Sequence, residues 1–232
     1  MEPRIRADFA ARKWVDTRRE AWVASPAAGV ERIPLDRVGG EVARATSLVR
    51  YAPGSRFAAH AHGGGEEILV LEGTFADEHG AYPAGTYLRN PPGTRHAPYT
   101  DDGCVLFVKL WQFRAGDDRP VRIDTRDAAW HPGLEPGLAV LPLHEHDGES
   151  VALVRWRPGT RFNAHTHPGG EEIFVLEGVF QDEFGDYPAG TWLRNPPWSR
   201  HAPRSDPGCL IYVKVGHLAE PAAGAAAPSP PA

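Results

Sequence analysis

The chain has 232 residues and a formal net charge of −5, which allows one large domain or two domains of roughly 100 residues each. The mild negative charge and the lack of any Lys/Arg cluster exclude the basic surface of a nucleic-acid-binding protein. No stretch reaches the ~18 apolar residues of a membrane span, and the N-terminus lacks the apolar core of a signal peptide, so we expect a cytoplasmic protein with no nucleic-acid or membrane partner.

Residues 1–15 form a predicted N-terminal arm. Ile5, Phe9 and Trp14 make it too apolar for a free tail, and only Asp8 to Lys13 allow a short helix. We expect the arm to cover a sheet edge, either of this chain or of a neighbouring subunit, because exposed edges promote association.

Residues 16–114 contain short β-rich runs separated by turn signals. The runs at 45–51, 68–71 and 104–108 consist of branched and apolar residues, and Gly/Pro-containing segments such as 83–85 lie between them. Many short strands at intervals of about ten residues predict a sandwich or a barrel. This part of the chain is therefore expected to be all-β.

Residues 120–217 repeat the first unit. Residues 47–109 align with 152–214 without a gap, and about two positions in three are identical. Upstream the offset changes, so the first copy carries three extra residues near 37–44. The chain thus predicts two tandem domains joined by a polar stretch. Residues 218–232, rich in Ala and Pro, are expected to be disordered.

The two cysteines are repeat equivalents on apolar runs. Cys104 and Cys209 each begin a β-rich segment, where a buried free thiol is more common than a disulfide. Free thiols favour a reducing compartment, in agreement with the expected cytoplasmic location.

A cluster of metal-binding residue types occurs once in each unit. His60 and His62 are two residues apart and so project from one face of a strand. Glu66 follows a three-glycine loop that can bend its carboxylate alongside them, and His96 opens the strand expected to pair with the first. The pattern recurs at an offset of 105, so the predicted metal ligands are His60, His62, Glu66 and His96, together with His165, His167, Glu171 and His201.

Three neutral nitrogens and one carboxylate oxygen suit a borderline divalent ion. We expect one ion per domain, with zinc favoured and iron, manganese, nickel or copper as alternatives. Four protein ligands can saturate zinc, whereas an ion that prefers five or six ligands keeps a position open for water, oxygen or substrate. The residues leave open whether the sites are catalytic, and they identify no catalytic residue.

The spacing resembles the cupin signature. Its first motif combines a glycine, His-x-His, a glutamate and a second glycine, and its second motif combines a glycine, Pro-x-Gly and a histidine. Trp198 replaces the central glycine of the second motif and is expected to reshape the mouth of the second pocket, while Thr100 and Ser205 replace a final asparagine that is no ligand. The matching positions are Gly54, His60, His62, Glu66, Gly73, Gly85, Pro91, Gly93 and His96, then Gly159, His165, His167, Glu171, Gly178, Gly190, Pro196 and His201.

More narrowly, Gly-Gly-Glu-Glu-Ile-x-Val-Leu-Glu-Gly and Asp-Tyr-Pro-Ala-Gly-Thr-x-Leu-Arg-Asn-Pro-Pro resemble the ChrR-type cupin, the C-terminal half of some zinc anti-sigma factors. The resemblance covers nearly the whole chain and implies zinc at the eight residues above. Those anti-sigma factors also carry a helical zinc domain with a His and a Cys-x-x-Cys pair. Residues 1–40 contain neither residue type, which excludes sigma-factor sequestration by that route.

ChrR-like cupins are also similar to small bacterial dioxygenases that cleave acetylacetone and dihydroxyacetophenone. Their usual site has three histidines, whereas a glutamate is added here. The fold implied by the resemblance is a bicupin, with two jelly-roll barrels packed edge to edge about a pseudo-twofold axis.

Other repeated charges carry weaker signals. Glu67 and Glu172 adjoin the predicted ligands and could replace them, but we expect them to face outward or to orient a ligand. The repeated arginines are expected to form salt bridges or to be solvated rather than to clamp an acidic substrate. These arginines are Arg56, Arg89, Arg95, Arg161, Arg194 and Arg200.

The remaining polar aromatic residues suggest no further site. Tyr82 and Tyr187 are expected to pack turns. His144 and His146 form a third His-x-His, but it has no copy in the first unit, so we expect loop histidines there. His217 carries no signal.

These observations support three hypotheses. The first is a non-haem metalloenzyme, such as a metal-dependent dioxygenase or another cupin oxidoreductase, whose partner is a small oxygenated organic molecule. The second is a non-catalytic zinc-binding sensor or regulatory cupin. The third is a structural bicupin with one degenerate site. A homodimer is compatible with all three.

Overall fold

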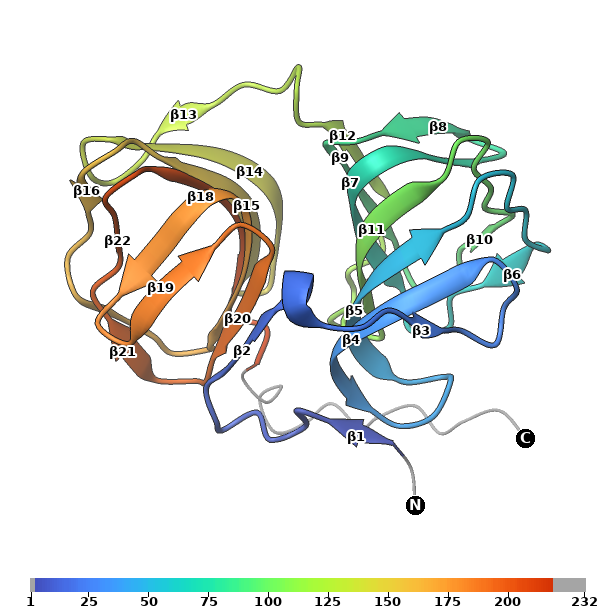
Figure 1. Ribbon diagram of the computed structural model, residues 1–232, viewed down its shortest axis with the longest axis horizontal. Helices are drawn as coiled ribbons and strands as arrows, with labels where there is room; N and C mark the ends of the chain where they lie inside the picture. The colour runs from blue at the N-terminus through green and yellow to red at the C-terminus, as the bar shows by residue number, and fades with distance from the viewer. Residues whose placement is uncertain (1–2, 219–232) are drawn as a thin grey trace.

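The computed structural model describes residues 3–218 as two β-barrels side by side (Figure 1). The prediction of two tandem jelly-roll barrels from one internal duplication is confirmed. Within the described part, the helical content is one 3-10 turn, η1 (Thr17–Arg19). The short helix expected at Asp8 to Lys13 is wrong, because that segment forms turns. No helix in this range is long and apolar enough to span a bilayer.

Barrel 1 is built on a nine-stranded sheet with the order β1-β4-β5-β11-β7-β9-β12, in which β3 adds to β4 and β8 to β7. A second, two-stranded sheet, β10-β6, carries histidines. These strands are β1 (Arg4–Ile5), β3 (Val23–Ala24), β4 (Val30–Val38), β5 (Arg44–Tyr51), β6 (His60–Ala61), β7 (Glu66–Asp77), β8 (Gly80–Pro83), β9 (Thr86–Asn90), β10 (Arg95–His96), β11 (Cys104–Leu110) and β12 (Val121–Asp124).

Barrel 2 repeats this plan with the sheet order β13-β14-β15-β23-β18-β20-β2, while β19 and β22 add to β18, β16 adds to β22, and β17-β21 form the small sheet. These strands are β2 (Lys13–Asp16), β13 (His131–Pro132), β14 (Leu138–His146), β15 (Glu149–Trp156), β16 (Thr160–Arg161), β17 (His165–His167), β18 (Glu171–Asp182), β19 (Gly185–Pro188), β20 (Thr191–Asn195), β21 (Ser199–His201), β22 (Arg204–Ser205) and β23 (Cys209–Val215).

Each large sheet is buried on both faces. On β7, Ile68 and Val70 point into barrel 1, while Leu69 between them packs toward barrel 2. Successive side chains of a strand point to opposite faces, and a sheet covered on both faces needs apolar residues at every position. This arrangement explains why residues 68–71 form an unbroken apolar run. The buried free thiols Cys104 and Cys209 agree with the sequence prediction.

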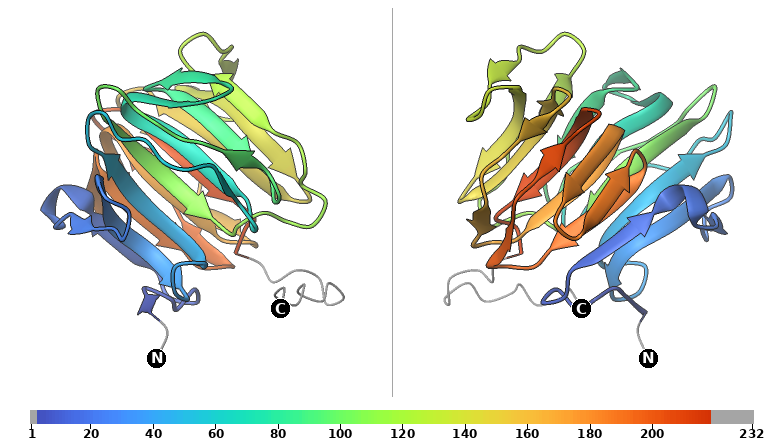
Figure 2. Two further views of the ribbon diagram at one scale, coloured as in Figure 1. Left: turned by 90° about the vertical axis from the view of Figure 1, so that its right-hand side faces the viewer. Right: turned by 60° about the vertical axis from the view of Figure 1, so that its left-hand side comes forward.

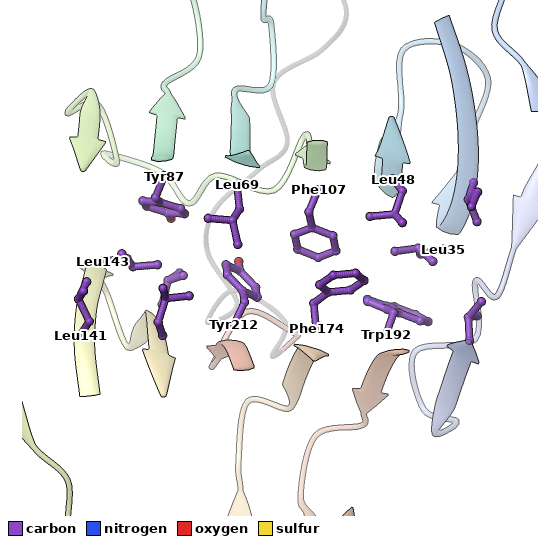
Figure 3. Packing of buried hydrophobic residues seen from close by; sticks show 14 residues of the cluster. Leu35, Leu48, Leu69, Tyr87, Phe107, Leu141, Leu143, Phe174, Trp192 and Tyr212 are labelled. Carbon is purple, nitrogen blue, oxygen red and sulfur yellow. The ribbon is translucent and has the colours of Figure 1, made fainter. Parts of the chain in front are cut away.

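The two large sheets stack face to face, so the expected edge-to-edge packing is wrong. Between them lies an apolar cluster to which both barrels contribute (Figure 3). Phe107 of barrel 1 stacks on Phe174 with ring centroids 5.1 Å apart and meets Tyr212 edge-on at 5.2 Å. Figure 3 shows the facing rows, with Leu48, Leu69, Tyr87 and Phe107 opposite Phe174, Trp192 and Tyr212.

The strand that precedes each repeat completes a sheet. β2 pairs with β20 of barrel 2, with Lys13 opposite Arg194, although it precedes the repeat that forms barrel 1. Its repeat equivalent β12 pairs with β9 of barrel 1, with Val121 opposite Arg89. The two barrels are therefore linked by exchanged edge strands as well as by the apolar faces that Figure 2 shows as stacked layers.

The N-terminal arm covers sheet edges of both barrels, as its apolar residues predicted. β1 pairs with the edge of β4, and β2 adds to β20. At the other end, the N–H of Leu218 donates to the carbonyl of Gly169 at 2.9 Å. The rest of the predicted disordered tail, residues 219–232, lies outside the described residues.

Candidate metal centres

In barrel 1 three of the four predicted ligands lie on strands, and His62 directly follows β6. β10 pairs with β6 in a register that places His96 opposite His60, and His62 and Glu66 lie on either side of the glycine loop that leads into β7. One ring nitrogen of each of the three histidines lies within 4.8 Å of the others. The Glu66 carboxylate lies 3.4 Å from His62 Nε2 and 3.6 Å from His96 Nε2.

Barrel 2 repeats this geometry. His165 lies opposite His201 in the β17-β21 register, and the nitrogens of the three histidines again lie within 4.8 Å of one another. The Glu171 carboxylate is 3.4 Å from His167 Nε2 and 3.5 Å from His201 Nε2. Thus both predicted sets of side chains are brought together by the fold.

The donor spacing suits a shared metal ion. Two ligands with bonds of about 2.1 Å and angles of roughly 90–110° lie about 3.0–3.4 Å apart. His62 Nε2 and His96 Nε2 are 2.8 Å apart, and His167 Nε2 and His201 Nε2 are 3.1 Å apart. His60 Nδ1 lies 3.1 Å from the carbonyl of Ala58, an arrangement that places the proton on Nδ1 and leaves the lone pair of Nε2 free.

Carboxylate and amide groups behind the clusters hold the ligands. Asp77 accepts a hydrogen bond from His96 Nδ1 at 3.2 Å, and the Asn90 amide donates to Glu66 at 3.0 Å. In barrel 2, Asn195 donates to Glu171 at 2.8 Å, and Asp182 lies 3.5 Å from His201 Nδ1. Such partners fix the orientation and tautomer of ligands.

Sequence reasoning missed these supporting residues. A signal was present, because Asp77 and Asp182 occupy the same place in both repeats, as do Asn90 and Asn195. The two aspartates differ in their other contacts, since Asp182 also binds the guanidinium of Arg12 from the N-terminal arm.

Burial favours the neutral form of three of the six clustered imidazoles. It lowers the pKa of His62 to about 4, with nearby His60 adding to the effect. Burial also lowers the pKa of His96 and of His167, and in both cases outweighs the charge of the adjacent glutamate. At His201 burial acts in the same direction, but Asp182 and Glu171 outweigh it and leave the pKa raised. Neutral imidazoles present the lone pairs that a metal ion requires.

The barrel 1 cluster opens into a cavity of about 890 Å³. His60, His62 and Glu66 line one part of it, and apolar residues such as Val49 and Phe57 line another. His60 is exposed, whereas His62 and Glu66 are buried. A molecule in this cavity would therefore have access to the face of the cluster that His60 presents.

Each centre has one tryptophan at a position where the other centre has glycine. Trp111 and its counterpart Gly216 both have left-handed backbones, with φ of 58° and 83°, and so do Trp198 (64°) and its counterpart Gly93 (87°). A non-glycine residue in this region costs roughly 1–2 kcal/mol and is concentrated at functional sites. Trp198 is 72% exposed, and its backbone N–H donates to the carbonyl of His167 at 2.8 Å.

Trp111 covers the glycine loop of the first centre. A Cβ added to Gly64 would lie 2.1 Å from the Trp111 ring, which explains the glycine at that position. The Trp111 N–H donates to the carbonyl of Gly65 at 3.2 Å. The two centres therefore share a set of candidate ligands and differ in the residues around it.

The glutamates that follow the predicted ligands point away from the metal centres into the interface between the barrels. Lys214 of barrel 2 lies 2.8 Å from Glu67, and Lys109 of barrel 1 lies 2.5 Å from Glu172. Burial alone would raise the pKa of each glutamate, but the facing lysines outweigh it and hold both pKa values low. Glu67 and Glu172 thus face out of their own barrels as predicted, although they are buried.

The interface holds further buried polar groups. Arg89 contacts Glu67 at 2.7 Å and also Asp117, and Arg194 contacts Asp36 at 3.0 Å. His217 lies 3.0 Å from Glu172, and burial lowers the pKa of this imidazole to about 3. No role for His217 was predicted from the sequence.

The third His-x-His is not in a loop, and that expectation is wrong. His144 lies on β14, is buried, and pairs with Asp117 at 2.9 Å. Asp117, His144 and Glu149 have the spacing of a metal-binding group. However, Arg89 binds Asp117, and Lys214 lies 2.8 Å from Glu149. Since Arg89 and Lys214 already neutralise these carboxylates, the cluster belongs to the buried ion pairs of the interface, which we call the charge network.

The repeated arginines and tyrosines are mainly structural, as predicted. Arg56 forms a surface pair with Asp101 at 2.7 Å, whereas Arg89 is fully buried. The Tyr82 hydroxyl donates to Asp77 at 3.0 Å across the β7-β8 turn. Arg161 and Tyr187 repeat the contacts of their counterparts, with Asp206 and Asp182, whereas Arg194 contacts Asp36, which is not the equivalent of an Arg89 partner. Arg95 and Arg200 are exposed.

Comparison with known proteins identifies the family. The model of the ChrR Cupin-like domain matches the chain twice, at residues 10–114 and 118–219. The chain belongs to the ChrR Cupin-like family. It is a bicupin, since one match falls on each repeat. No curated protein matches it in sequence.

Solved structures share the bicupin fold at low identity. A protein of Nostoc punctiforme, provisionally described as a dioxygenase, is 17% identical with a TM-score of 0.75, over 95% of this chain and 88% of that one. Ylba from Escherichia coli is 15% identical with a TM-score of 0.69, over 90% and 92%. The nickel(II) complex of the pirin YhhW from E. coli is 14% identical with a TM-score of 0.66, over 88% and 98%. At such identities these likenesses show the fold.

Proposed function

We propose that this ChrR-like bicupin binds one divalent metal ion in each barrel through three histidines and one glutamate, and that barrel 1 transforms a small oxygenated organic molecule. Zinc is the first expected ion, with iron, manganese and nickel as alternatives. The proposed ligands are the two sets predicted from the sequence, His60, His62, Glu66 and His96, and His165, His167, Glu171 and His201.

The observation that carries the proposal is the cavity of about 890 Å³ at the barrel 1 cluster. Its size lies within the range of small-molecule sites, roughly 300–1,000 Å³. Its wall combines apolar side chains such as Val49 and Phe57 with the polar face of His60. A structural metal site needs no such space beside its ligands.

The protein's own residues would prepare the chemistry. A bound divalent ion acts as a Lewis acid that polarises a substrate oxygen. Asp77 holds the His96 ring, and Asn90 holds the Glu66 carboxylate, so neither ligand must reorganise. Tyr51 also lines the cavity. Burial raises the pKa of its hydroxyl, which therefore stays protonated and can donate a hydrogen bond to the bound molecule.

A zinc sensor without turnover is the second candidate. The family match favours it, because the resemblance to the ChrR-type cupin of zinc anti-sigma factors implies a zinc-binding module. The ligand count favours it too, since four protein ligands can saturate tetrahedral zinc. In that case the metal would stabilise the barrels, and the cavity would bind an effector.

Metal analysis and turnover in one preparation test the proposal. Protein loaded with zinc, iron or manganese is assayed for oxygen uptake and product formation with diketones and hydroxyketones. We expect turnover that is lost in His62→Ala and retained in the matched barrel 2 variant His167→Ala. Closed four-coordinate zinc in both centres, with no product from any substrate, would instead establish the sensor.

A further inference from the structure

We propose that the barrel 1 cavity selects a small organic anion, with Arg32 as the residue that binds its carboxylate, and that barrel 2 lacks this selectivity. The inference rests on the proposed function and names the substrate class of that site. It comes from charged side chains that line the cavity at positions where the two repeats differ.

Two arginines on β4 line the cavity together with the metal ligands, namely Arg32 and Arg37. A bulge between Pro34 and Asp36 shifts the alternation of this strand. Because of that shift, Arg37 faces the same interior as Arg32, whereas Leu35 packs in the interface between the barrels. The strand thus presents two positive charges to the barrel 1 cavity.

Arg32 has a partner that a ligand can replace. In the part of the chain that the structure describes, its guanidinium pairs with Glu41 alone, at 3.2 Å. The Glu41 side chain is 64% exposed and the Arg32 side chain 30% exposed. An exposed pair of this kind contributes little, so the Glu41 carboxylate can swing into water when another carboxylate enters. A fork-shaped guanidinium is well suited to bind a carboxylate through two hydrogen bonds.

The charged residues of this wall other than the predicted metal ligands are specific to barrel 1. Glu41 lies in the three-residue insertion that the second repeat lacks. Strand register places Val140 in barrel 2 where barrel 1 has Arg32, since these residues pair with the equivalent Val154 and Val49.

Two further residues that line the barrel 1 cavity are replaced in barrel 2. Glu145 stands in place of Arg37, because it pairs with Ser150 as Arg37 pairs with Ala45. Gly216 stands in place of Trp111, which lines the barrel 1 cavity. Barrel 2 therefore lacks both positive charges at these positions and carries a negative charge at one of them.

The rest of the wall defines the body of the ligand. Val49, Phe57, Leu110 and Trp111 line the cavity beside the arginines. A ligand with a carboxylate at one end, a short apolar or aromatic body and an oxygen toward His60 would use every part of this wall. Neutral molecules of the same shape would leave Arg32 paired with Glu41 and would bind more weakly.

The test compares hydrocinnamate with its neutral amide, by calorimetry on metal-loaded full-length protein whose metal content is measured in the same samples. A charge-assisted hydrogen bond of about 1.5–3 kcal/mol corresponds to roughly tenfold to a hundredfold in affinity. We expect the acid to bind at least tenfold more tightly than the amide, and Arg32→Gln to abolish that preference.

The control is Arg50→Gln, which removes the same charge from the neighbouring strand β5. Arg50 pairs with Glu31 and lines the cleft between the barrels rather than the cavity, so the preference should persist. Glu41→Gln provides an independent variant, because loss of the resident carboxylate frees Arg32, and the acid should bind two- to fivefold more tightly.

Equal binding of acid and amide by the wild type, or a preference that survives Arg32→Gln, overturns the inference, and so does a Glu41→Gln variant with unchanged affinity for the acid. None of these outcomes bears on whether the protein binds metal ions. A wild-type protein that holds no metal contradicts the proposed function instead, and the acid-over-amide ratio from the same titration still decides the role of Arg32.

Discussion

Replacing Lys109 with methionine should destabilise the protein more than any other single change in the charge network. The Lys109 side chain is fully buried, and its ammonium contacts Glu172 at 2.5 Å and the Thr46 hydroxyl at 3.1 Å. Methionine keeps the shape but leaves Glu172 with Trp192 Nε1 at 2.7 Å and with His217, neither of which carries a charge at neutral pH. An uncompensated buried carboxylate costs about 3–5 kcal/mol, and we expect the upper end.

The repeat provides an internal comparison. Lys214→Met removes the equivalent lysine from Glu67, but Arg89 remains 2.7 Å from that carboxylate. The loss should therefore lie near the lower end, about 3 kcal/mol. The double variant Lys109→Met with Glu172→Gln should recover part of the loss, because position 172 then no longer carries an uncompensated carboxylate.

Urea unfolding followed by far-UV circular dichroism measures these differences. The control is Lys13→Met, the third lysine of the chain, which is half-buried on β2 and should stay within about 0.5 kcal/mol of the wild type. The reasoning is refuted if Lys109→Met loses less than about 1 kcal/mol, or if Lys214→Met proves the more destabilised of the two.

Three further predictions address the ligand supports, the pH response and the interface. Asp77→Asn should weaken metal binding in barrel 1 by about 10- to 100-fold and leave the affinity of barrel 2 unchanged, and Asp182→Asn should do the reverse. Competition with a chelator measures both affinities. Equal effects of either variant on both centres would contradict the assignment. In metal-free protein, the unfolded chain takes up the His62 proton near pH 6.5 but the folded one only near pH 4. His62 alone should therefore lower the free energy of unfolding by roughly 3 kcal/mol as the pH drops through that window. A His62→Gln variant whose urea midpoint falls as steeply as that of the wild type would argue against it. Phe107→Ala should lower the free energy of unfolding by about 3–5 kcal/mol, because the ring is buried between the barrels. Phe184→Ala, at a 61% exposed position, should change thermal unfolding little. Similar losses of stability in both variants would show that the interface is not a hydrophobic core.

The internal repeat made the fold and the ligand clusters predictable. His60 and His62 at a spacing of two, with Glu66 beyond a glycine loop, allow few arrangements once they lie on a strand. The same pattern at a constant offset predicted a second copy. The three histidines of each set come together in space, and each glutamate lies beside two of them.

The packing of the barrels was harder to predict, although signals existed. The unbroken apolar run at 68–71 indicates a sheet buried on both faces, which edge-to-edge packing would not need. The chain has three lysines, and two of them, Lys109 and Lys214, lie at equivalent positions of the repeats inside apolar strands. A lysine within such a strand predicts a buried ionic partner.

The cavity could not be derived from the sequence. Arg32 and Arg37 lie where the repeats diverge, and their direction depends on the bulge between Pro34 and Asp36. A shift of one residue turns side chains to the opposite face of a strand. Only the folded register shows that both arginines share a chamber with His60.

Elemental analysis of purified protein, with histidine variants of each barrel, tests the central claim most directly. The account predicts two divalent ions per chain in the wild type, one in either His62→Ala or His167→Ala, and none in the double variant. A double variant that still holds two ions, or a wild type that binds none after incubation with zinc, iron or manganese, would contradict it.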